Sequence, residues 1–227
     1  QTISSGGLAS NTTINSGGSQ FISNGGKADV TWLNSGGFQS VFSGGSANST
    51  IIANGGIQSV ADGGIVTNNI VSSGGGEVVS SGGITHDVVV NSGGSQVVLF
   101  SGSAFDTVVN SYGRQDISSG GYAGGTILNN QGYQWVSSGG YAENTIVNSG
   151  GSQCVMSGGL GSDTIINSSG IQNIFGEGSA LITYVNGGVQ NVFGHATSTA
   201  INFHGQQNIH NGGLAESTTI DGSAYQF

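Results

Sequence analysis

Residues 15–33 read NSGGSQFISNGGKADVTWL, and residues 148–166 read NSGGSQCVMSGGLGSDTII. The second glycine of the leading pair returns every 19 residues along most of the chain, at Gly18, Gly37, Gly56, Gly75, Gly94, Gly113, Gly132, Gly151 and Gly170. The last three intervals, counted to Gly222, are 18, 17 and 17 residues. A fixed period of this length across a whole chain is typical of a solenoid.

The unbroken period predicts a single elongated domain over residues 1–227, with about twelve coils and shortened repeats from residue 171 onward. A second glycine pair follows each leading pair by 8 residues, so every repeat has a short arm and a long arm that meet at two turns. Glycine suits such turns because it adopts backbone angles that other residues resist.

Two apolar columns indicate which side chains face inward. The fourth residue after the leading glycine pair is β-branched from Ile22 to Ile209. The seventh residue after the second pair is apolar from Ile14 to Ile220, with Phe203 in the last place but one. β-Branched residues favour strands, so we expect an all-β fold, a parallel β-solenoid with one coil per repeat.

Two polar columns share the parity of these inward residues. A glutamine stands two residues before the inward aliphatic residue of the short arm, as Gln20 does before Ile22. A threonine stands in the same relation to the long arm, as Thr31 does before Leu33. Stacked amides and hydroxyls can satisfy one another along a solenoid axis, so we expect structural ladders here rather than a binding role.

The column between this threonine and the inward aliphatic residue is expected to face outward, yet it is almost entirely apolar. We call it the long-arm stripe: Trp32, Ile51, Ile70, Val89, Val108, Ile127, Ile146, Ile165 and Tyr184. A continuous apolar stripe outside a rod is typical of a contact surface. The alternatives are that another wall covers the stripe, or that these residues are simply good strand formers. Outward Tyr133 and Trp135 on the short arm are a second candidate contact.

The chain has few charges, with 2 basic residues against 11 acidic ones and a formal net charge of −9. This balance argues against nucleic acid as a partner, because nucleic-acid binding rests on clustered Lys and Arg. Cys154 is the only cysteine, so it cannot form an intrachain disulfide.

No catalytic motif is recognisable, and we assign no catalytic residue, metal site or cofactor. The alternative is a polysaccharide-cleaving or glycan-binding β-helix that uses acids such as Asp106 or Asp163, since glycoside hydrolysis needs paired carboxyl groups. We expect the acids to be solvated corner charges instead, because no two adjacent coils are expected to carry acids together with a basic or aromatic cluster.

The repeat unit resembles that of the self-associating autotransporter adhesins of the AIDA and antigen 43 type. Period, both glycine pairs, glutamine and Thr-x-Ile coincide over essentially the whole chain, most closely in residues 15–33 and 148–166. The resemblance implies a right-handed parallel β-helix, a passenger fragment exported to the outer surface of a Gram-negative bacterium. It also implies adhesion to a host-cell receptor or glycan, autoaggregation with like passengers, biofilm formation and a part in virulence.

The resemblance further implies O-heptosylation of repeat Ser or Thr by a dedicated heptosyltransferase during biogenesis. The hydroxyls that match precede a glycine pair in either turn. These candidate acceptors are Ser5, Ser16, Ser35, Ser43, Ser81, Ser92, Ser119, Ser138, Ser149 and Ser157.

Overall fold

The computed structural model describes residues 1–227, and every element in it is a β-strand. The short arms form one sheet of 13 parallel strands, in which each strand pairs with the equivalent strand of the next coil. Its strands are β1 (Thr2–Ile3), β3 (Ser19–Ile22), β5 (Phe38–Val41), β7 (Ile57–Val60), β10 (Gly76–Val79), β13 (Ser95–Val98), β16 (Arg114–Ile117), β19 (Tyr133–Val136), β22 (Ser152–Val155), β24 (Ile171–Ile174), β26 (Val189–Val192), β28 (Gln206–Ile209) and β31 (Tyr225–Gln226).

The long arms form the second parallel sheet, of 18 strands. Six long arms run through unbroken: β2 (Leu8–Ile14), β4 (Lys27–Leu33), β6 (Ser46–Ile52), β23 (Leu160–Ile166), β25 (Ser179–Asn186) and β27 (His195–Asn202). The others are divided into two strands each: β8 (Ile65–Thr67) and β9 (Ile70–Val71), β11 (Ile84–His86) and β12 (Val89–Val90), β14 (Ser103–Phe105) and β15 (Val108–Val109), β17 (Tyr122–Gly124) and β18 (Ile127–Leu128), β20 (Tyr141–Glu143) and β21 (Ile146–Val147), β29 (Leu214–Glu216) and β30 (Thr219–Ile220).

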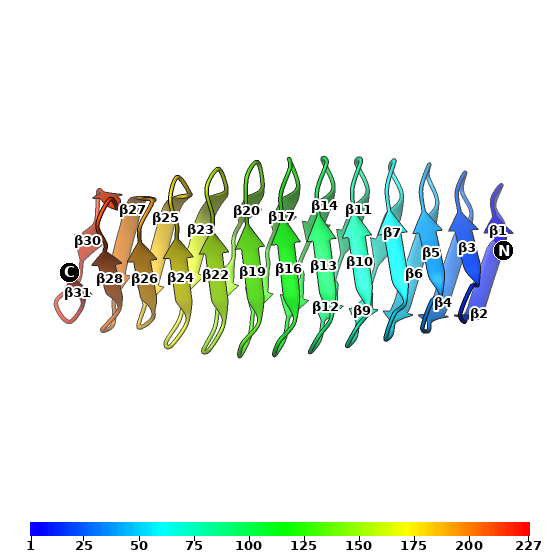
Figure 1. Ribbon diagram of the computed structural model, residues 1–227, viewed down its shortest axis with the longest axis horizontal. Coiled ribbons are helices and arrows are strands. Elements are labelled where there is room, and N and C mark those ends of the chain that lie inside the picture. Colours follow the sequence, from blue (N-terminus) through cyan, green and yellow to red (C-terminus); the bar gives the residue numbers. More distant parts are fainter.

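The coils stack into a straight rod with a right-handed winding. In Figure 1 the short-arm strands run upward in front, the chain returns behind them, and the coils advance from the N-terminus on the right to the C-terminus on the left. The expectation of a right-handed parallel β-helix with about one coil per 19 residues is confirmed.

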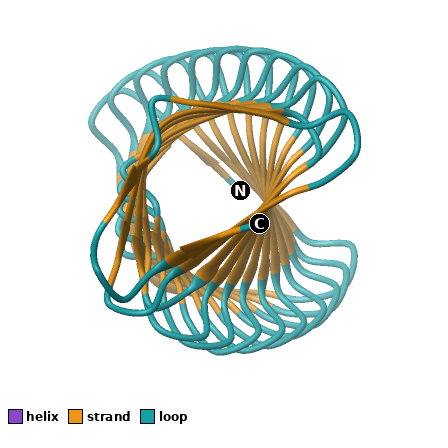
Figure 2. Ribbon diagram, turned by 90° about the vertical axis from the view of Figure 1, so that its left-hand side faces the viewer, coloured by secondary structure: helices purple, strands orange, loops and turns teal.

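Each long arm bends at a corner because one residue there adopts the left-handed conformation, and in six of the arms the strand is interrupted at this point. The φ angles of these corner residues lie between 52° and 73°. The corner column is Asn11, Val30, Ser49, Asn68, Asp87, Asp106, Gly125, Asn144, Asp163, Ile182, Ser198 and Ser217. Asn, Asp and Gly tolerate this conformation best. The view along the rod in Figure 2 shows the bent strands around the core and two ridges of turns that project from it.

The corner also changes which residues face inward, and it creates a buried column that the sequence interpretation missed. Alternation is interrupted at the left-handed residue, so both the corner residue and its predecessor point outward. The column before them is buried from Ala9 to Ala196 and is mostly alanine. The core therefore takes two columns from each short arm and three from each long arm.

The expected inward columns are confirmed along most of the rod, but two predicted members near the C-terminus are exposed: Ile220 in the last coil, at 46%, and Phe203. Phe203 was predicted to be buried, but it lies in a turn with a φ of 48° and is 72% exposed. Ile201 pairs with Val185 and occupies the buried place instead. The shortening is confined to two turns, those before Val189 and before His195. The second of these turns has lost two residues, so the count along the following long arm ran two residues too far.

The last repeat is again full-length. Tyr225 pairs with Gln206, which makes Ala224, and not Gly222, the counterpart of Gly205. No helix long and apolar enough to cross a membrane is found.

The buried amides form the ladder that the glutamine column predicted. Gln134 Nε2 donates to Gln115 Oε1 at 2.8 Å, and Gln153 Nε2 donates to Gln134 Oε1 at 2.7 Å. Thr145 Oγ1 adds a bond of 3.2 Å to the same Gln134 oxygen. Each glutamine thus gives its NH₂ to one neighbouring coil and its oxygen to the other, which satisfies a fully buried polar column.

The pattern changes around one short arm, that of Glu77. A glutamic acid stands in the glutamine column, Asn69 and Val88 stand in the threonine column, and Thr85 stands in the alanine column. Asn69 Nδ2 donates to both Gln58 Oε1, at 2.5 Å, and Glu77 Oε1, at 2.7 Å. Gln96 Nε2 donates to Glu77 Oε2 at 2.6 Å.

Candidate functional site

The two ridges of turns consist of tight four-residue turns of two kinds. In the turn after the long arm, Gly18 N donates to Asn15 O at 2.8 Å, and only the third residue, Gly17, has a positive φ. This is the pattern of a type II turn. In the first turn after a short arm, Ser5 and Gly6 have φ angles of 52° and 77°, which is the pattern of type I′.

Neighbouring turns are also bonded to one another. Gly36 N donates to Gly55 O at 3.0 Å, and Ser119 N donates to Ser138 O at 2.8 Å, as strands do in a sheet. The first glycine of a pair leaves room for the serine beside it, because a Cβ on Gly36 would lie 3.1 Å from Ser16 Oγ. Each ridge is therefore a regular row of short turns on a fixed backbone.

All ten candidate acceptor serines lie on these ridges, and all ten are exposed. Ser73 was missed, although it is exposed and precedes the glycine pair at Gly74. Its turn begins with Ser72 where most turns of this kind have asparagine, and the serine before the glycine pair was the signal that could have found it.

The long-arm stripe lies on the outside of the second half of each long arm. Its members pair in register from coil to coil, as Ile127 does with Ile146, and they alternate with buried residues. No second layer covers them, and their exposure reaches 38% at Ile70 and 45% at Tyr184. The stripe is thus an accessible apolar band along one edge of the corner.

The two acids named in the alternative interpretation, Asp106 and Asp163, do not lie close together. Asp106 and Asp163 belong to the corner column and are separated by three coil steps, about 14 Å at strand spacing. Glycoside hydrolysis needs two carboxyl groups within about 10 Å. Their left-handed φ angles, 54° and 53°, explain aspartate at these corners.

The expectation that no adjacent coils combine acids with aromatic residues is wrong. Asp87 and Asp106 occupy successive corners beside His86 and Phe105, whose rings stack with centroids 5.0 Å apart. Sequence columns did not reveal this group because its members belong to two columns that the corner brings together.

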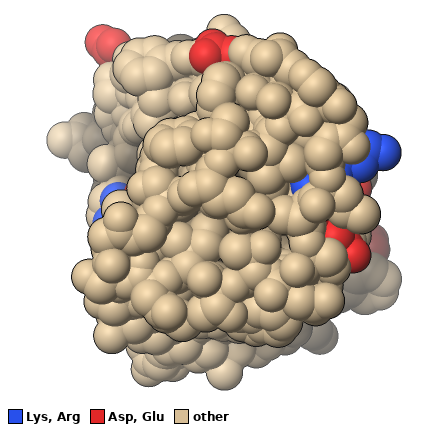
Figure 3. Space-filling model, turned by 90° about the vertical axis from the view of Figure 1, so that its right-hand side faces the viewer, with Lys and Arg blue, Asp and Glu red and all other residues tan.

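Figure 3, which shows the N-terminal end of the rod, has its few charged side chains at the rim of an otherwise uncharged face.

The aromatic row continues into the next coils through Tyr122 and Tyr141. Tyr122 lies across Gly124, and its hydroxyl donates to Glu143 Oε2 at 2.6 Å. This hydrogen bond, together with burial, raises the pKa of Tyr122 to about 12. Burial and the negative charge of Glu143 also raise the pKa of Tyr141.

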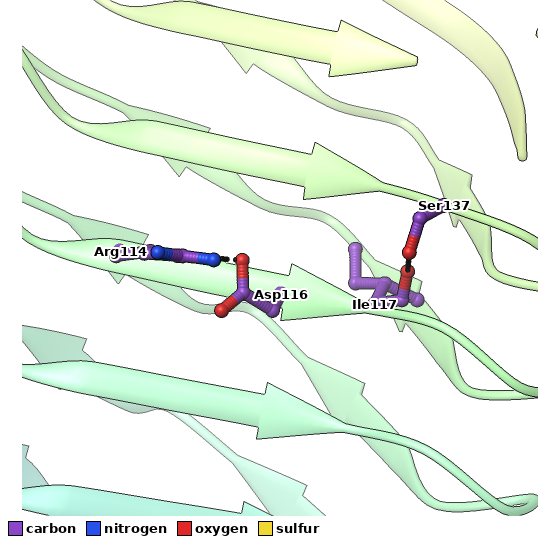
Figure 4. Close-up of polar contacts among 4 residues, drawn as sticks. All are labelled: Arg114, Asp116, Ile117 and Ser137. Atoms are coloured by element: carbon purple, nitrogen blue, oxygen red, sulfur yellow. Dashed lines mark hydrogen bonds and ion pairs between the residues drawn. The ribbon is translucent and has the colours of Figure 1, made fainter. Parts of the chain in front are cut away.

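A second polar group lies on the outer face of the short-arm sheet, on β16 and β19. We call it the Arg114 cluster: Arg114, Asp116, Tyr133 and Trp135. Arg114 Nε donates to Asp116 Oδ1 at 2.7 Å (Figure 4), and the guanidinium carbon lies 4.3 Å from the centre of the Trp135 ring. On the same strand, Ile117 points inward, and its carbonyl accepts a 3.5 Å bond from Ser137 Oγ of the next coil.

Comparison with known proteins supports an adhesin. The family described as "Adhesin of bacterial autotransporter system, probable stalk" matches residues 81–132 and 128–188. A crystal structure of a TibC-catalysed hyper-glycosylated TibA fragment superposes with a TM-score of 0.83 at 40% sequence identity, covering 100% of this chain and 91% of the fragment. No match was found among curated proteins. Because the identity extends over the full β-helix, the chain belongs to the AIDA-type autotransporter adhesins, as a segment of the passenger.

Proposed function

We propose that this rod is a cell-surface stalk that holds bacteria to one another and to host cells, and that its turn serines carry O-linked heptose. The family supports the surface-exposed passenger. The uniform coils supply a long body whose contacts repeat along its length, and many weak repeated contacts add up by avidity.

The observation that carries the modification is the position of the ten serines. All are exposed on turns, where a hydroxyl can enter a transferase site without disturbing the strand ladder. The similar TibA fragment is hyper-glycosylated in a reaction catalysed by TibC. We therefore propose that a heptosyltransferase of the same kind acts on this chain, at the ten candidate serines and at Ser73.

Intact mass spectrometry of the chain produced with and without the heptosyltransferase of its native host tests this proposal. We expect a series of added heptose masses and, after proteolysis, modified peptides that map to the turns. Ser40 and Ser59, which lie half-buried within strands, are the internal controls and should stay unmodified. A mass equal to that of the bare sequence in the presence of the enzyme would contradict the proposal.

For self-association and host-cell contact we propose the long-arm stripe, with its centre at Ile127, Ile146 and Ile165. Its apolar band is continuous over nine coils and open to solvent, which is typical of a contact surface. Tyr133 and Trp135 on the opposite sheet are the secondary contact, since exposed aromatic residues are favoured anchors.

Changing Ile127, Ile146 and Ile165 together to Ser should weaken aggregation of cells that display the chain while the fold persists. The matched control changes Val78, Val97 and Val189, which are outward residues of the other sheet, to Ser. Unchanged aggregation together with a collapse of the melting temperature would show that the stripe is needed for folding and not for contact.

A further inference from the structure

The large side chains of the Arg114 cluster stand out from the outer face of the short-arm sheet, where the side chains of the neighbouring coils are smaller. Along the sheet, its neighbours in the preceding coil are Ser95 and Val97, and those in the following coil are Ser152 and Cys154. All four neighbours are smaller than the arginine and the two aromatic residues between them. Trp135 and Tyr133 keep 42% and 39% of their surface exposed.

The guanidinium of this cluster is held in place by its partners, but most of its N–H donors remain free. Asp116 engages only Nε, and the ring of Trp135 supports the guanidinium plane. The two Nη groups, which carry four of the five N–H donors of an arginine, make no hydrogen bond, and the side chain is 48% exposed. A fork of donors fixed in this way has lost part of its conformational entropy in advance, which favours binding.

The charge of the molecule narrows the class of ligand. Arg114 is the only arginine of a chain with a net charge of −9, and the other cation, Lys27, lies on the long-arm sheet. A polyanion such as nucleic acid needs several cations, so it does not fit. A purely apolar partner would bury the free N–H donors without acceptors. A single carboxylate fits, because its two oxygens match the arginine fork.

We infer that the Arg114 cluster is a binding site for a sugar that bears a carboxylate, such as the terminal acidic unit of a cell-surface glycan. The carboxylate accepts from the Nη groups of Arg114, and the sugar ring lies against the exposed surface of Trp135. The Tyr133 hydroxyl and the second oxygen of Asp116 are available to the sugar hydroxyls. This site gives the proposed adhesin a glycan class to recognise, and it rests on that function only for its biological setting.

The two tryptophans make the test direct, because the Trp32→Phe variant leaves Trp135 as the only indole. Its fluorescence is followed in this variant during titration with 3′-sialyllactose, with digalacturonic acid and with neutral lactose. We expect a saturable change in the low millimolar range for one or both acidic sugars, as one small exposed site allows, and none for lactose. Adding Arg114→Gln should weaken binding at least about tenfold, and adding Lys27→Gln should leave it unchanged.

Three outcomes would overturn the assignment. They are equal changes with lactose, retention of binding by the Arg114→Gln variant with an unchanged melting temperature, or no saturable change up to about 10 mM of either acidic sugar. Saturation by acetate at the same concentrations would overturn the sugar part, since it would reveal a site for any carboxylate. Because these titrations use the isolated rod, they are read separately from aggregation and adhesion of whole cells.

Discussion

The amide ladder is continuous from Gln96 to Gln172, whereas between Gln58 and Gln96 it passes through a carboxyl group. In the first region every glutamine after Gln96 donates its NH₂ to the glutamine of the preceding coil and accepts with its oxygen from the glutamine of the following coil. The same hydrogen bond therefore repeats from coil to coil. In the second region Glu77 has no NH₂ to donate to Gln58. Asn69, in the place of a threonine, supplies two donors and closes the gap.

The difference shows that all hydrogen bonds between the glutamines of the ladder point the same way along the rod. Replacing one glutamine by glutamic acid therefore requires a new donor in the neighbouring threonine column. Glu77 is fully buried among amides, hydroxyls and aliphatic groups, with no cation beside it. Burial raises the pKa of Glu77, while hydrogen bonds from Gln96 and Asn69 lower it. Thr85 also faces the carboxyl, although its hydroxyl makes no hydrogen bond of good geometry.

The largest effect is expected when a carboxyl enters the regular region without an asparagine to compensate for it. Gln134→Glu removes the donor to Gln115 Oε1 and buries a negative charge with no cation beside it. At pH 7 we expect a loss of about 3–5 kcal/mol in the free energy of unfolding, measured by urea denaturation. Ser152→Glu, which adds the same charge on the outer face, is the control. Equal losses in both variants would show that burial is not the cause.

A smaller loss is expected from Asn69→Thr, which restores the common residue of the column but keeps Glu77. One buried acceptor, on Gln58 or on Glu77, then lacks its donor, at a cost of about 2–3 kcal/mol at pH 7. The double variant Asn69→Thr with Glu77→Gln rebuilds the regular pattern and should recover most of this loss. Additive effects of the two changes in the double-mutant cycle would contradict the compensation.

Glu77→Gln alone should stabilise the rod at neutral pH by about 1 kcal/mol, since the new amide can donate to Gln58 and no charge is buried. The pH dependence has a definite sign. The folded-state pKa of Glu77 is raised, so its contribution to stability is fully present below the unfolded pKa and is lost as pH rises through the folded pKa.

The advantage of Glu77→Gln should therefore grow from pH 4 to pH 7, as measured by unfolding at each pH. Asp62, His86 and Asp87 lie on the outside of the same coils and are common to both proteins, so their contributions cancel in the difference. A difference between the two proteins that stays constant over this range would rule out Glu77 as the source.

The smallest effect is expected from Val88→Thr, a change of nearly constant volume. Val88 holds the place from which Thr107 donates to Gln96 one coil later, so a hydroxyl there is within reach of Glu77. One added hydrogen bond to a carboxylate should stabilise the rod by about 0.5–1 kcal/mol at pH 7. It should also reduce the difference between this protein and its Glu77→Gln variant, which thermal unfolding of the four combinations measures.

The columns with a strict period were predictable because each is defined by its distance from a glycine. The inward glutamine, threonine and aliphatic residues and the ten exposed serines all follow this count. The alanine column was not predicted, because strict alternation breaks where one residue turns left-handed. The run of Asn, Asp, Ser and Gly at that position was the available signal, since these residues favour this backbone conformation.

Contacts between side chains of different columns could not be predicted by counting residues from a glycine. The period places Arg114 beside Tyr133 and Asp116 beside Trp135. It does not say that the arginine side chain bends across to the tryptophan, which depends on rotamers and on the space left by small neighbours. For the same reason the stacking of His86 on Phe105 beside two aspartates was missed. In the last coils Phe203 was misplaced because glycine alone does not reveal which of two turns has lost residues.

The bonds from turn to turn, added to those of the two sheets, give the rod a mechanical property. All these bonds run along the rod axis, so a pull from end to end loads every bond across one boundary between coils at the same time. Successive boundaries carry the same force in series, as links of a chain do. The rod therefore resists tension up to the strength of its weakest boundary between coils. We expect the first break between Gln58 and Glu77, where one asparagine bridges the ladder.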